Sequence, residues 1–353
     1  MPGLRNLLHR LYRRLESDTH ELLYLFFEIT RKCNLSCRHC GSDCTAQSAA
    51  GELTGGSWLK IVDYFTERYS SDLMFVITGG EPLVSPDMER IGERIARAGR
   101  RWGFVTNCQL LTRDRLNKLV DCGLYSITVS LDGPREEHDF LRHKKGAFNN
   151  VIRALGYIAE ARIPQFDVVT CVYPGNLGKL DETASILLEN KVPAWRLFRI
   201  FPNGRAKDNP ELLVDFEATR RMIDWIVARR PYYAGKGLAL DYSCEGYLHP
   251  SVDRKVRRNS FFCRAGVNIA SILCDGTITG CPNNSPMFYE GNIVGNDFSD
   301  IWENGFGKFR RRDWMRKGLC ADCGSFAECR GSSIHLWHDE DRGIEFCYLH
   351  EKH

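Results

Sequence analysis

Short apolar runs alternate along this chain with amphipathic segments of helical period. Six runs rich in β-branched and aromatic residues predict strands, at residues 23–30, 73–77, 103–106, 125–130, 166–172 and 195–200. The segments between and after them predict helices, at about 57–69, 87–99, 112–121, 147–161, 178–190 and 213–229. Six strand–helix units in succession favour a parallel sheet with right-handed crossovers. We therefore expect an α/β fold, a partial (β/α)6 TIM-like barrel, whose functional groups gather at the carboxyl ends of the strands.

The regular alternation stops near residue 230. Residues 231–260 contain several Pro and Gly residues and predict an irregular linker. Residues 261–353 hold seven cysteines among turn residues, which predicts a small, irregular, cysteine-rich domain that folds around metal. Before the barrel, residues 4–15 place leucines at helical spacing with arginines between them. The expected organisation is a basic amphipathic helix at 1–21, the barrel at 22–230, the linker at 231–260 and the cysteine-rich domain at 261–353.

Composition narrows the class of protein. The formal net charge is only +3, which gives no global reason to expect a nucleic-acid partner. No apolar run approaches the roughly 20 residues of a membrane-spanning helix, and the N-terminus lacks the pattern of a secretory signal. The chain has 15 cysteines, an odd number crowded into two zones. Together these features predict a cytoplasmic protein whose thiolates bind metal, rather than a disulfide scaffold.

The first cysteine group follows the first predicted strand directly, as Cys33-x3-Cys37-x2-Cys40. Closely spaced cysteines are common zinc ligands, and tetrahedral sulfur sites suit either zinc or an iron–sulfur cluster. Three ligands would leave one iron of a [4Fe–4S] cluster open to a substrate. Cys44 is a candidate fourth ligand, and its alternative is a place on the following turn. Cys108, Cys122, Cys171 and Cys244 occur singly and are expected to be buried as small apolar residues.

This cysteine motif resembles that of the radical S-adenosylmethionine (SAM) enzymes, because Gly79–Gly80–Glu81–Pro82 follows at the end of the second strand. The resemblance covers roughly residues 22–215. It implies that Cys33, Cys37 and Cys40 bind three irons of a [4Fe–4S] cluster, and that SAM binds the fourth. It further implies reductive cleavage of SAM to a 5′-deoxyadenosyl radical, fed by a low-potential electron donor such as flavodoxin or ferredoxin.

The same resemblance assigns cofactor contacts. Gly79 and Gly80 are expected to let the backbone approach SAM, and Glu81 to help hold its ammonium group. Arg142 matches a position where related enzymes bind the cofactor carboxylate, a task suited to guanidinium. Three residues at the ends of the third and fourth strands are expected near the ribose and methionine: Asn107, Ser130 and Asp132. The alternative for these three is the capping of turns. No catalytic acid or base can be assigned.

The C-terminal cysteines are similar to the SPASM extension of radical enzymes that modify peptides. By this resemblance one auxiliary [4Fe–4S] cluster binds to Cys320, Cys323, Cys329 and Cys347. A second would bind to Cys263 and Cys281, but Ser333 replaces one further ligand and the stretch around Ile269 lacks another. Cys274 matches no family position and is a candidate substitute. The chain is thus expected to hold one or two auxiliary clusters, with zinc as the alternative.

Three hypotheses of function follow. The first is radical modification of a peptide or protein, by oxidation or cross-linking. The second is modification of a small metabolite or cofactor precursor, and the third is a zinc-stabilised, non-catalytic binding protein. The helix at residues 4–15 is expected to dock over the open end of the barrel, with peripheral contact to a membrane surface as the alternative.

Overall fold

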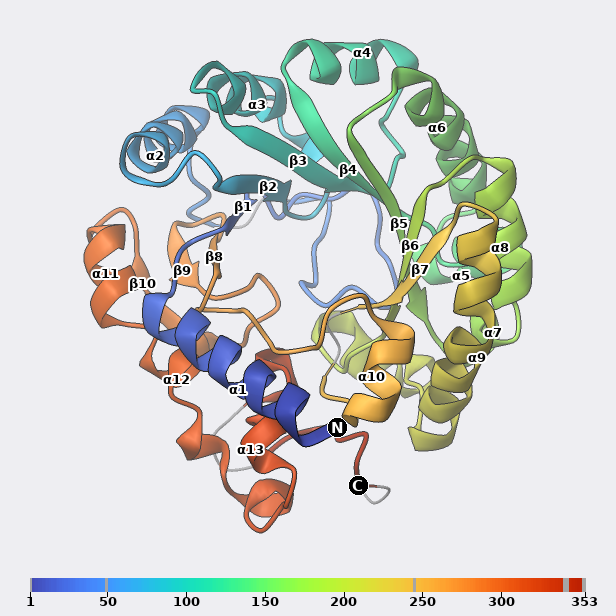
Figure 1. Ribbon diagram of the computed structural model, residues 1–353. Coiled ribbons are helices and arrows are strands. Elements are labelled where there is room, and N and C mark those ends of the chain that lie inside the picture. The colour runs from blue at the N-terminus through green and yellow to red at the C-terminus, as the bar shows by residue number, and fades with distance from the viewer. Residues whose placement is uncertain (1, 48–49, 244–245, 339–342, 351–353) are drawn as a thin grey trace.

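The computed structural model describes residues 2–47, 50–243, 246–338 and 343–350. Its centre is a curved ten-stranded sheet in the order β10-β9-β8-β1-β2-β3-β4-β5-β6-β7, with helices along its outer face (Figure 1). The strands are β1 (Tyr24–Glu28), β2 (Met74–Thr78), β3 (Arg101–Thr106), β4 (Leu124–Ser130), β5 (Gln165–Val172), β6 (Ala194–Arg199), β7 (Ala239–Tyr242), β8 (Ile269–Ile272), β9 (Thr277–Thr279) and β10 (Tyr289–Asn292). Strands β1 to β7 are all parallel, which confirms the predicted partial α/β barrel.

Helices connect the strands of the barrel, and the periodicity predicts all of them except the short helices Arg135–Arg142 and Pro174–Leu177. The connecting helices are α2 (Gly55–Arg68), α3 (Met88–Arg97), α4 (Arg113–Asp121), α5 (Arg135–Arg142), α6 (Ala147–Ala161), α7 (Pro174–Leu177), α8 (Leu180–Glu189) and α9 (Phe216–Gly235). Their apolar faces cover the sheet, as where the ring of Phe27 in β1 meets the ring of Trp58 in α2 at 5.1 Å between centroids. The C-terminal helices are α10 (Pro250–Val256), α11 (Phe298–Asn304), α12 (Gly307–Arg310) and α13 (Phe326–Cys329).

The expectation of an irregular linker at 231–260 is wrong. Helix α9 continues through Pro231 to Gly235, and β7 and α10 follow. Strand β7 pairs in parallel with β6, so it is a seventh strand of the barrel rather than part of a linker. The glycines and prolines there end or begin elements, and a four-residue strand carries too little periodicity to be recognised in sequence.

The C-terminal segment is part of the same sheet. Strand β8 pairs in parallel with β1, from Tyr24 opposite Ile269 to Phe27 opposite Ile272, and β9 and β10 extend the sheet as antiparallel strands. The cysteine-rich segment is therefore attached directly to the strand that leads into Cys33.

Helix α1 (Pro2–Thr19) binds the C-terminal part of the chain through its polar side, and its docking over the open end of the barrel stays a prediction. The Arg13 guanidinium donates to the backbone oxygens of Ala327 and Glu328, and Arg264 pairs with Glu16 at 3.2 Å. The apolar side faces solvent and exposes Leu4, Leu7, Leu8, Leu11 and Leu15. No helix within the described residues combines the length and apolar character needed to cross a membrane.

Candidate cofactor and cluster sites

The loop after β1 closes on itself and gathers four thiols. The Cys33 amide donates to the Thr45 carbonyl at 2.7 Å, which ties the two ends of the loop together. Inside it, Cys33, Cys37, Cys40 and Cys44 pack with Leu35 in one small cluster. The three thiols of the motif thus come from one loop at the carboxyl end of the barrel, and this arrangement fits a site-differentiated iron–sulfur cluster.

Burial and hydrogen bonding shift the pKa values of these thiols in opposite directions. Burial raises the pKa of Cys33 to about 11, and it also raises the pKa of Cys37, against the pull of the nearby Arg142 charge. Hydrogen bonds from Cys44 lower the pKa of Cys40, and the Cys44 amide lies 3.4 Å from the Cys40 sulfur. Because iron binds thiolate, loading Cys33 and Cys37 must release protons, whereas Cys40 is predisposed to bind.

The glycine pair after β2 permits close contact with the loop that leads into Cys33. A β-carbon on Gly79, whose φ is +150°, would lie 2.3 Å from the Thr30 oxygen, and one on Gly80 would lie 2.3 Å from the Lys32 oxygen. The Gly80 and Glu81 amides donate to those same two oxygens at 2.8 and 2.9 Å. The glycines therefore have a structural task in joining the two strand ends, and their contact with SAM stays a prediction.

Glu81 is fully buried and its carboxylate accepts three hydrogen bonds. The donors are the Asn107 amide at 2.7 Å, the Thr106 hydroxyl at 2.9 Å and the Leu83 amide at 3.2 Å. Burial raises its pKa to about 7 despite these donors. The carboxylate thus fixes the ends of β2 and β3 to each other, and its contact with the SAM ammonium group remains a prediction.

Asn107 reaches the cysteine loop. Its side-chain amide donates to the Asn34 side chain at 2.8 Å and lies 3.8 Å from the Cys33 sulfur. Ser130, the last residue of β4, is buried at the same end of the barrel. Both residues therefore lie at the carboxyl ends of strands where the sequence predicts the cofactor.

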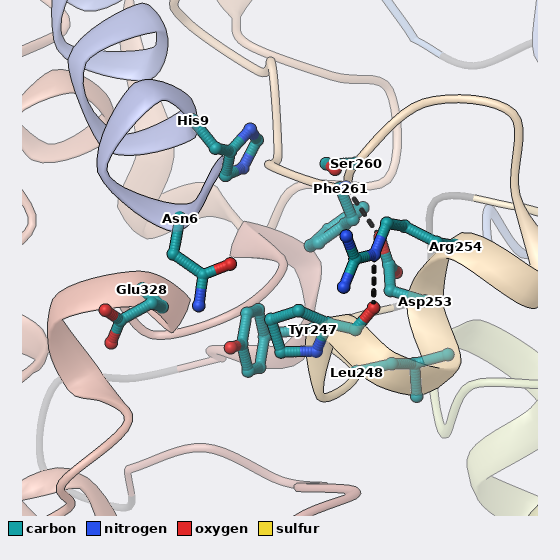
Figure 2. A pocket seen from close by; sticks show the side chains of 10 residues that line it. Asn6, His9, Tyr247, Leu248, Asp253, Arg254, Ser260, Phe261 and Glu328 are labelled. Atoms are coloured by element: carbon teal, nitrogen blue, oxygen red, sulfur yellow. Dashed lines mark hydrogen bonds between the residues drawn. The ribbon is translucent and has the colours of Figure 1, made fainter. Parts of the chain in front are cut away.

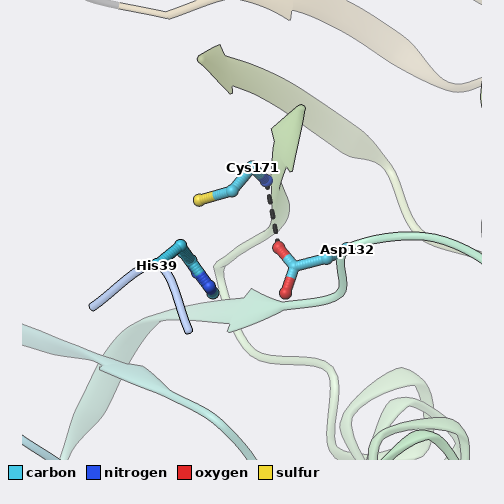
Figure 3. A group of neighbouring side chains, drawn as sticks. All are labelled: His39, Asp132 and Cys171. Carbon is cyan, nitrogen blue, oxygen red and sulfur yellow. Dashed lines mark hydrogen bonds between the residues drawn. The ribbon is translucent and has the colours of Figure 1, made fainter. Parts of the chain in front are cut away.

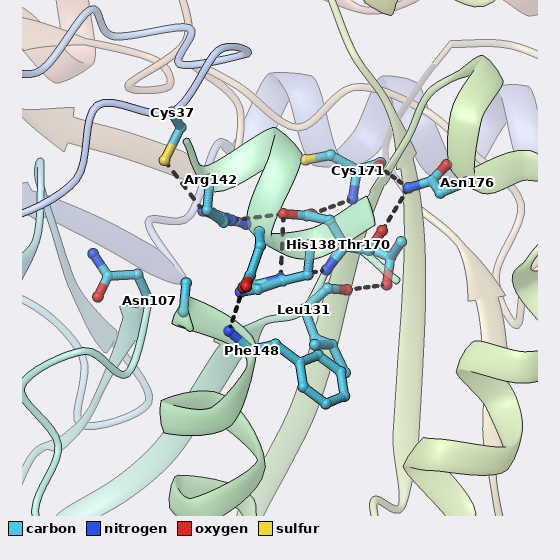
Figure 4. A network of polar contacts seen from close by, with 12 residues as sticks. Cys37, Asn107, Leu131, His138, Arg142, Phe148, Thr170, Cys171 and Asn176 are labelled. Carbon is cyan, nitrogen blue, oxygen red and sulfur yellow. Dashed lines mark hydrogen bonds and ion pairs between the residues drawn. The ribbon is translucent and has the colours of Figure 1, made fainter. Parts of the chain in front are cut away.

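Asp132 and Arg142 pair with each other in the interior, and Figure 4 shows Arg142 pointing toward Cys37. The Arg142 Nε donates to Asp132 Oδ2 at 2.6 Å, and its Nη1 lies 3.9 Å from the Cys37 sulfur. Burial by itself would raise the pKa of Asp132, but the charge and hydrogen bond of Arg142, together with the neighbouring histidines, outweigh it and hold the pKa below its ordinary range. Arg142 thus links the Asp132 carboxylate, after β4, to Cys37 of the motif and helps to position both. Its contact with the SAM carboxylate stays a prediction.

Two side chains at this centre were missed by the sequence reasoning. His39, Asp132 and Cys171 bring potential ligand atoms to within 4.8 Å of one another (Figure 3). Burial lowers the pKa of His39 to about 4, so its imidazole is neutral near pH 7. Cys171 lies near the carboxyl end of β5, and the strand-end rule that selects Asn107 and Asp132 would also have selected it.

The C-terminal cysteines fall into two sets. Burial raises the pKa of Cys329 to about 12 and of Cys320 to about 11, and neighbouring thiols of the same set add to both shifts. These interactions place four thiols close together: Cys320, Cys323, Cys329 and Cys347. Four clustered thiols fit an iron–sulfur cluster. Cys263 precedes β8 and Cys281 follows β9 in the chain, so the two cysteines flank the β8–β9 hairpin, and Cys244 lies outside the described residues.

A cavity of about 110 Å³ lies between α1 and α10, where His9, Tyr247 and Asp253 line it (Figure 2). None of the predicted site residues lines this cavity. Its volume is well below the roughly 300–1,000 Å³ of ligand pockets, so it does not compete with the barrel as the reaction site.

Comparison with known proteins agrees with this geometry. The family model of the radical SAM superfamily matches residues 27–187, and that of the SPASM iron–sulfur cluster-binding domain matches residues 263–324. The AdoMet-dependent heme synthase of Methanosarcina barkeri is 28% identical over 329 residues, which cover 86% of this chain and 89% of the relative. The mycofactocin maturase MftC of Mycolicibacterium smegmatis is 27% identical over 331 residues, which cover 92% and 81%.

Solved structures show the same fold. Streptococcus suis SuiB bound to S-adenosylmethionine superposes with a TM-score of 0.69 at 17% identity, over 90% of this chain and 76% of SuiB. The anSMEcpe protein with bound AdoMet and the Cp18Cys peptide gives a TM-score of 0.72 at 18% identity, over 93% of both chains. The family matches indicate an enzyme, which sets aside the hypothesis of a non-catalytic zinc protein. Residues 27–187 thus carry a radical SAM domain and residues 263–324 a SPASM domain, the domains with which proteins bind SAM, a [4Fe–4S] cluster and auxiliary iron–sulfur clusters.

Proposed function

We propose that this enzyme modifies a peptide or protein by radical chemistry, as an oxidation or a cross-link. When bound, the cluster on Cys33, Cys37 and Cys40 and its SAM supply the 5′-deoxyadenosyl radical that abstracts hydrogen from the substrate. The chain's own residues position that chemistry: Arg142 and Asn107 reach toward the Cys37 and Cys33 sulfurs from other strand ends.

The observation that carries this proposal is the gathering of four thiols in the C-terminal domain. That domain is joined to the barrel through β8, which pairs with β1, the strand leading into Cys33. A cluster there is held in a fixed relation to the barrel and offers a site that can accept an electron from a substrate radical. Relatives support a peptide substrate, since MftC is named a maturase and SuiB has been solved bound to the precursor peptide SuiA.

A second candidate is modification of a cofactor precursor. It is favoured by the relatives from Methanosarcina barkeri, which include a heme synthase and an Fe-coproporphyrin III synthase that is 26% identical over 333 residues. Both candidates use the same cluster chemistry and differ in the molecule that enters the barrel.

A direct comparison of substrates tests the proposal. The anaerobically reconstituted enzyme is reduced with dithionite and incubated with SAM, either with short peptides encoded beside its gene or with Fe-coproporphyrin III. We expect a peptide product in mass spectrometry that accumulates together with 5′-deoxyadenosine. Conversion of the porphyrin with unchanged peptides would establish the second candidate instead.

A matched pair of variants separates the two cluster sites. Cys320→Ser/Cys323→Ser should still form 5′-deoxyadenosine but lose the product, because only the C-terminal set is altered. Cys122→Ser, at the end of α4, should keep both activities. Full product formation by the Cys320→Ser/Cys323→Ser variant would contradict the assigned role of the C-terminal cluster. The same assays probe the proposed electron donor, since reduced flavodoxin or ferredoxin should replace dithionite.

A further inference from the structure

The region around Cys263 and Cys281 does not fit a second auxiliary cluster. Iron–sulfur clusters are held by about four soft thiolate ligands, and these two cysteines are the thiols of that region within the described residues. Whether another ligand completes the site depends on what Ser333 and the stretch around Ile269 do at the two missing ligand positions, and on where Cys274 lies.

Ser333 is committed to a structural hydrogen bond. It is fully buried, and its hydroxyl oxygen accepts from the Gly246 amide at 2.9 Å. Its neighbour Ser332 accepts from the Tyr247 amide at 2.9 Å in the same way. A hydroxyl is a far poorer iron–sulfur ligand than a thiolate, and this one joins two segments of backbone instead.

Ile269 cannot supply a ligand either. It is the first residue of β8 and pairs with Tyr24 of β1, and its carbonyl accepts from the Gly266 amide at 2.8 Å. Its side chain is a hydrocarbon, and the backbone around it is fixed by the sheet. No other ligand-bearing residue takes this place in the strand.

Cys274 lies at the wrong end of the hairpin. Strand β9 is antiparallel to β8, with Ser271 opposite Thr279, so the chain returns to the start of β8 before it reaches Cys281. Cys263 also precedes that start, whereas Cys274 lies in the turn at the far end, where its carbonyl accepts from the Leu53 amide at 2.7 Å. At about 3.3 Å per strand residue, the turn is on the order of 10–15 Å from the start of β8.

Arg312 joins the segments that a cluster would otherwise connect. Its buried guanidinium donates to the carbonyl oxygens of Phe309 at 2.7 Å, Cys263 at 2.8 Å and Ser332 at 3.1 Å. Hydrogen bonds from a charged donor are about twice as strong as neutral ones. Three chain segments are thereby held together without metal.

We propose that this enzyme holds a single auxiliary [4Fe–4S] cluster, on Cys320, Cys323, Cys329 and Cys347, and that a hydrogen-bonded junction of Ser332, Ser333 and Arg312 replaces the second. This proposal rests on the cluster role given to the C-terminal cysteines under the proposed function, but not on the nature of the substrate. The enzyme therefore carries two clusters in total, one for SAM and one auxiliary.

Iron content tests this count on the full chain. After anaerobic reconstitution and desalting, we expect about eight irons per chain, and Mössbauer spectra that account for two clusters. The variant Cys263→Ser/Cys281→Ser should keep about eight, whereas Cys320→Ser/Cys323→Ser should fall to about four. About twelve irons per chain in the unaltered enzyme would by themselves overturn the proposal. In that case, the loss of about four irons in a Cys244→Ser variant would identify Cys244 as the ligand that completes the second auxiliary cluster.

The junction has its own measurement. Ser333→Ala removes the acceptor of the buried Gly246 amide and should lower the thermal midpoint while the iron content stays at about eight. A fall to about four irons in this variant would show that the residue supports a cluster and would contradict the junction. A wrong substrate assignment would leave all of these iron counts unchanged, so the two proposals fail separately.

Discussion

Breaking the buried ion pair between Asp132 and Arg142 should be one of the most destabilising single changes in the barrel. Asp132→Asn keeps the size of the side chain but removes its charge. Arg142, whose side chain is only 10% exposed, would then lie in the interior with no carboxylate at the 2.6 Å position. Breaking a buried ion pair by removing one partner typically costs about 3–5 kcal/mol, because a charge is left without compensation.

A surface pair of equal length provides the control. Arg94 and Asp63 also approach to 2.6 Å, but their side chains are 52% and 34% exposed. Exposed pairs contribute about 0.2–1 kcal/mol, so Asp63→Asn should change stability little. Because the two ion pairs have the same N–O distance, a difference in stability between the two variants reflects burial.

Anaerobic thermal unfolding of the reconstituted enzyme measures the difference. At about 2–4 °C per kcal/mol, Asp132→Asn should lower the midpoint by about 6–20 °C and Asp63→Asn by less than about 4 °C. The double variant Asp132→Asn/Arg142→Met should recover much of the loss, since it removes the orphaned charge. Equal shifts for Asp132→Asn and Asp63→Asn, or no recovery in the double variant, would refute the reasoning.

Three further predictions follow from the described contacts. Arg13→Ala should destabilise the protein by about 1–3 kcal/mol, because two backbone oxygens lose their donor. Leu11 is exposed, so Leu11→Ala should cost less than about 0.5 kcal/mol in the same unfolding assay. The opposite order would mean that the leucine side of α1 is buried. Cys37→Ala should abolish 5′-deoxyadenosine formation measured by chromatography while Cys122→Ala retains it, and activity in the first variant would reject the cluster assignment. Burial raises the pKa of Glu28 from 4.5 to about 7, so its contribution to stability is complete below about pH 4.5 and is lost as the pH rises through 7. Glu28→Gln should therefore flatten the fall in melting temperature between pH 5 and pH 8, and an unchanged slope would show that this carboxyl does not titrate as inferred.

Local periodicity was sufficient to predict the first six strands of the barrel, but not β7. The six predicted strands and their helices are present within a few residues of the expected bounds, because each carries its own apolar pattern. The strand-end rule also placed Asn107, Ser130 and Asp132 at one end of the sheet. Those features depend on short stretches of sequence.

The features that the sequence did not predict depend on contacts between distant segments, and a single sequence does not show such contacts. The pairing of β8 with β1 is of this kind, as is the approach of Arg142 to Cys37. The orientation of α1 has the same origin. Its leucine spacing does not show which side of the helix is bound, and that side carries Arg13, which donates to the carbonyl oxygens of Ala327 and Glu328.

The pairing of β8 with β1 also affects how the protein is made. During synthesis, β1 emerges first and can pair with β2 soon afterwards, but its other edge is completed only by residues 269–272. At about 5–20 residues per second, that edge stays open for on the order of 10–50 s while the rest of the barrel is translated. An unpaired strand edge is a template for wrong pairing. The nascent barrel should therefore depend on chaperones, and expression should fall most sharply for truncations that remove β8.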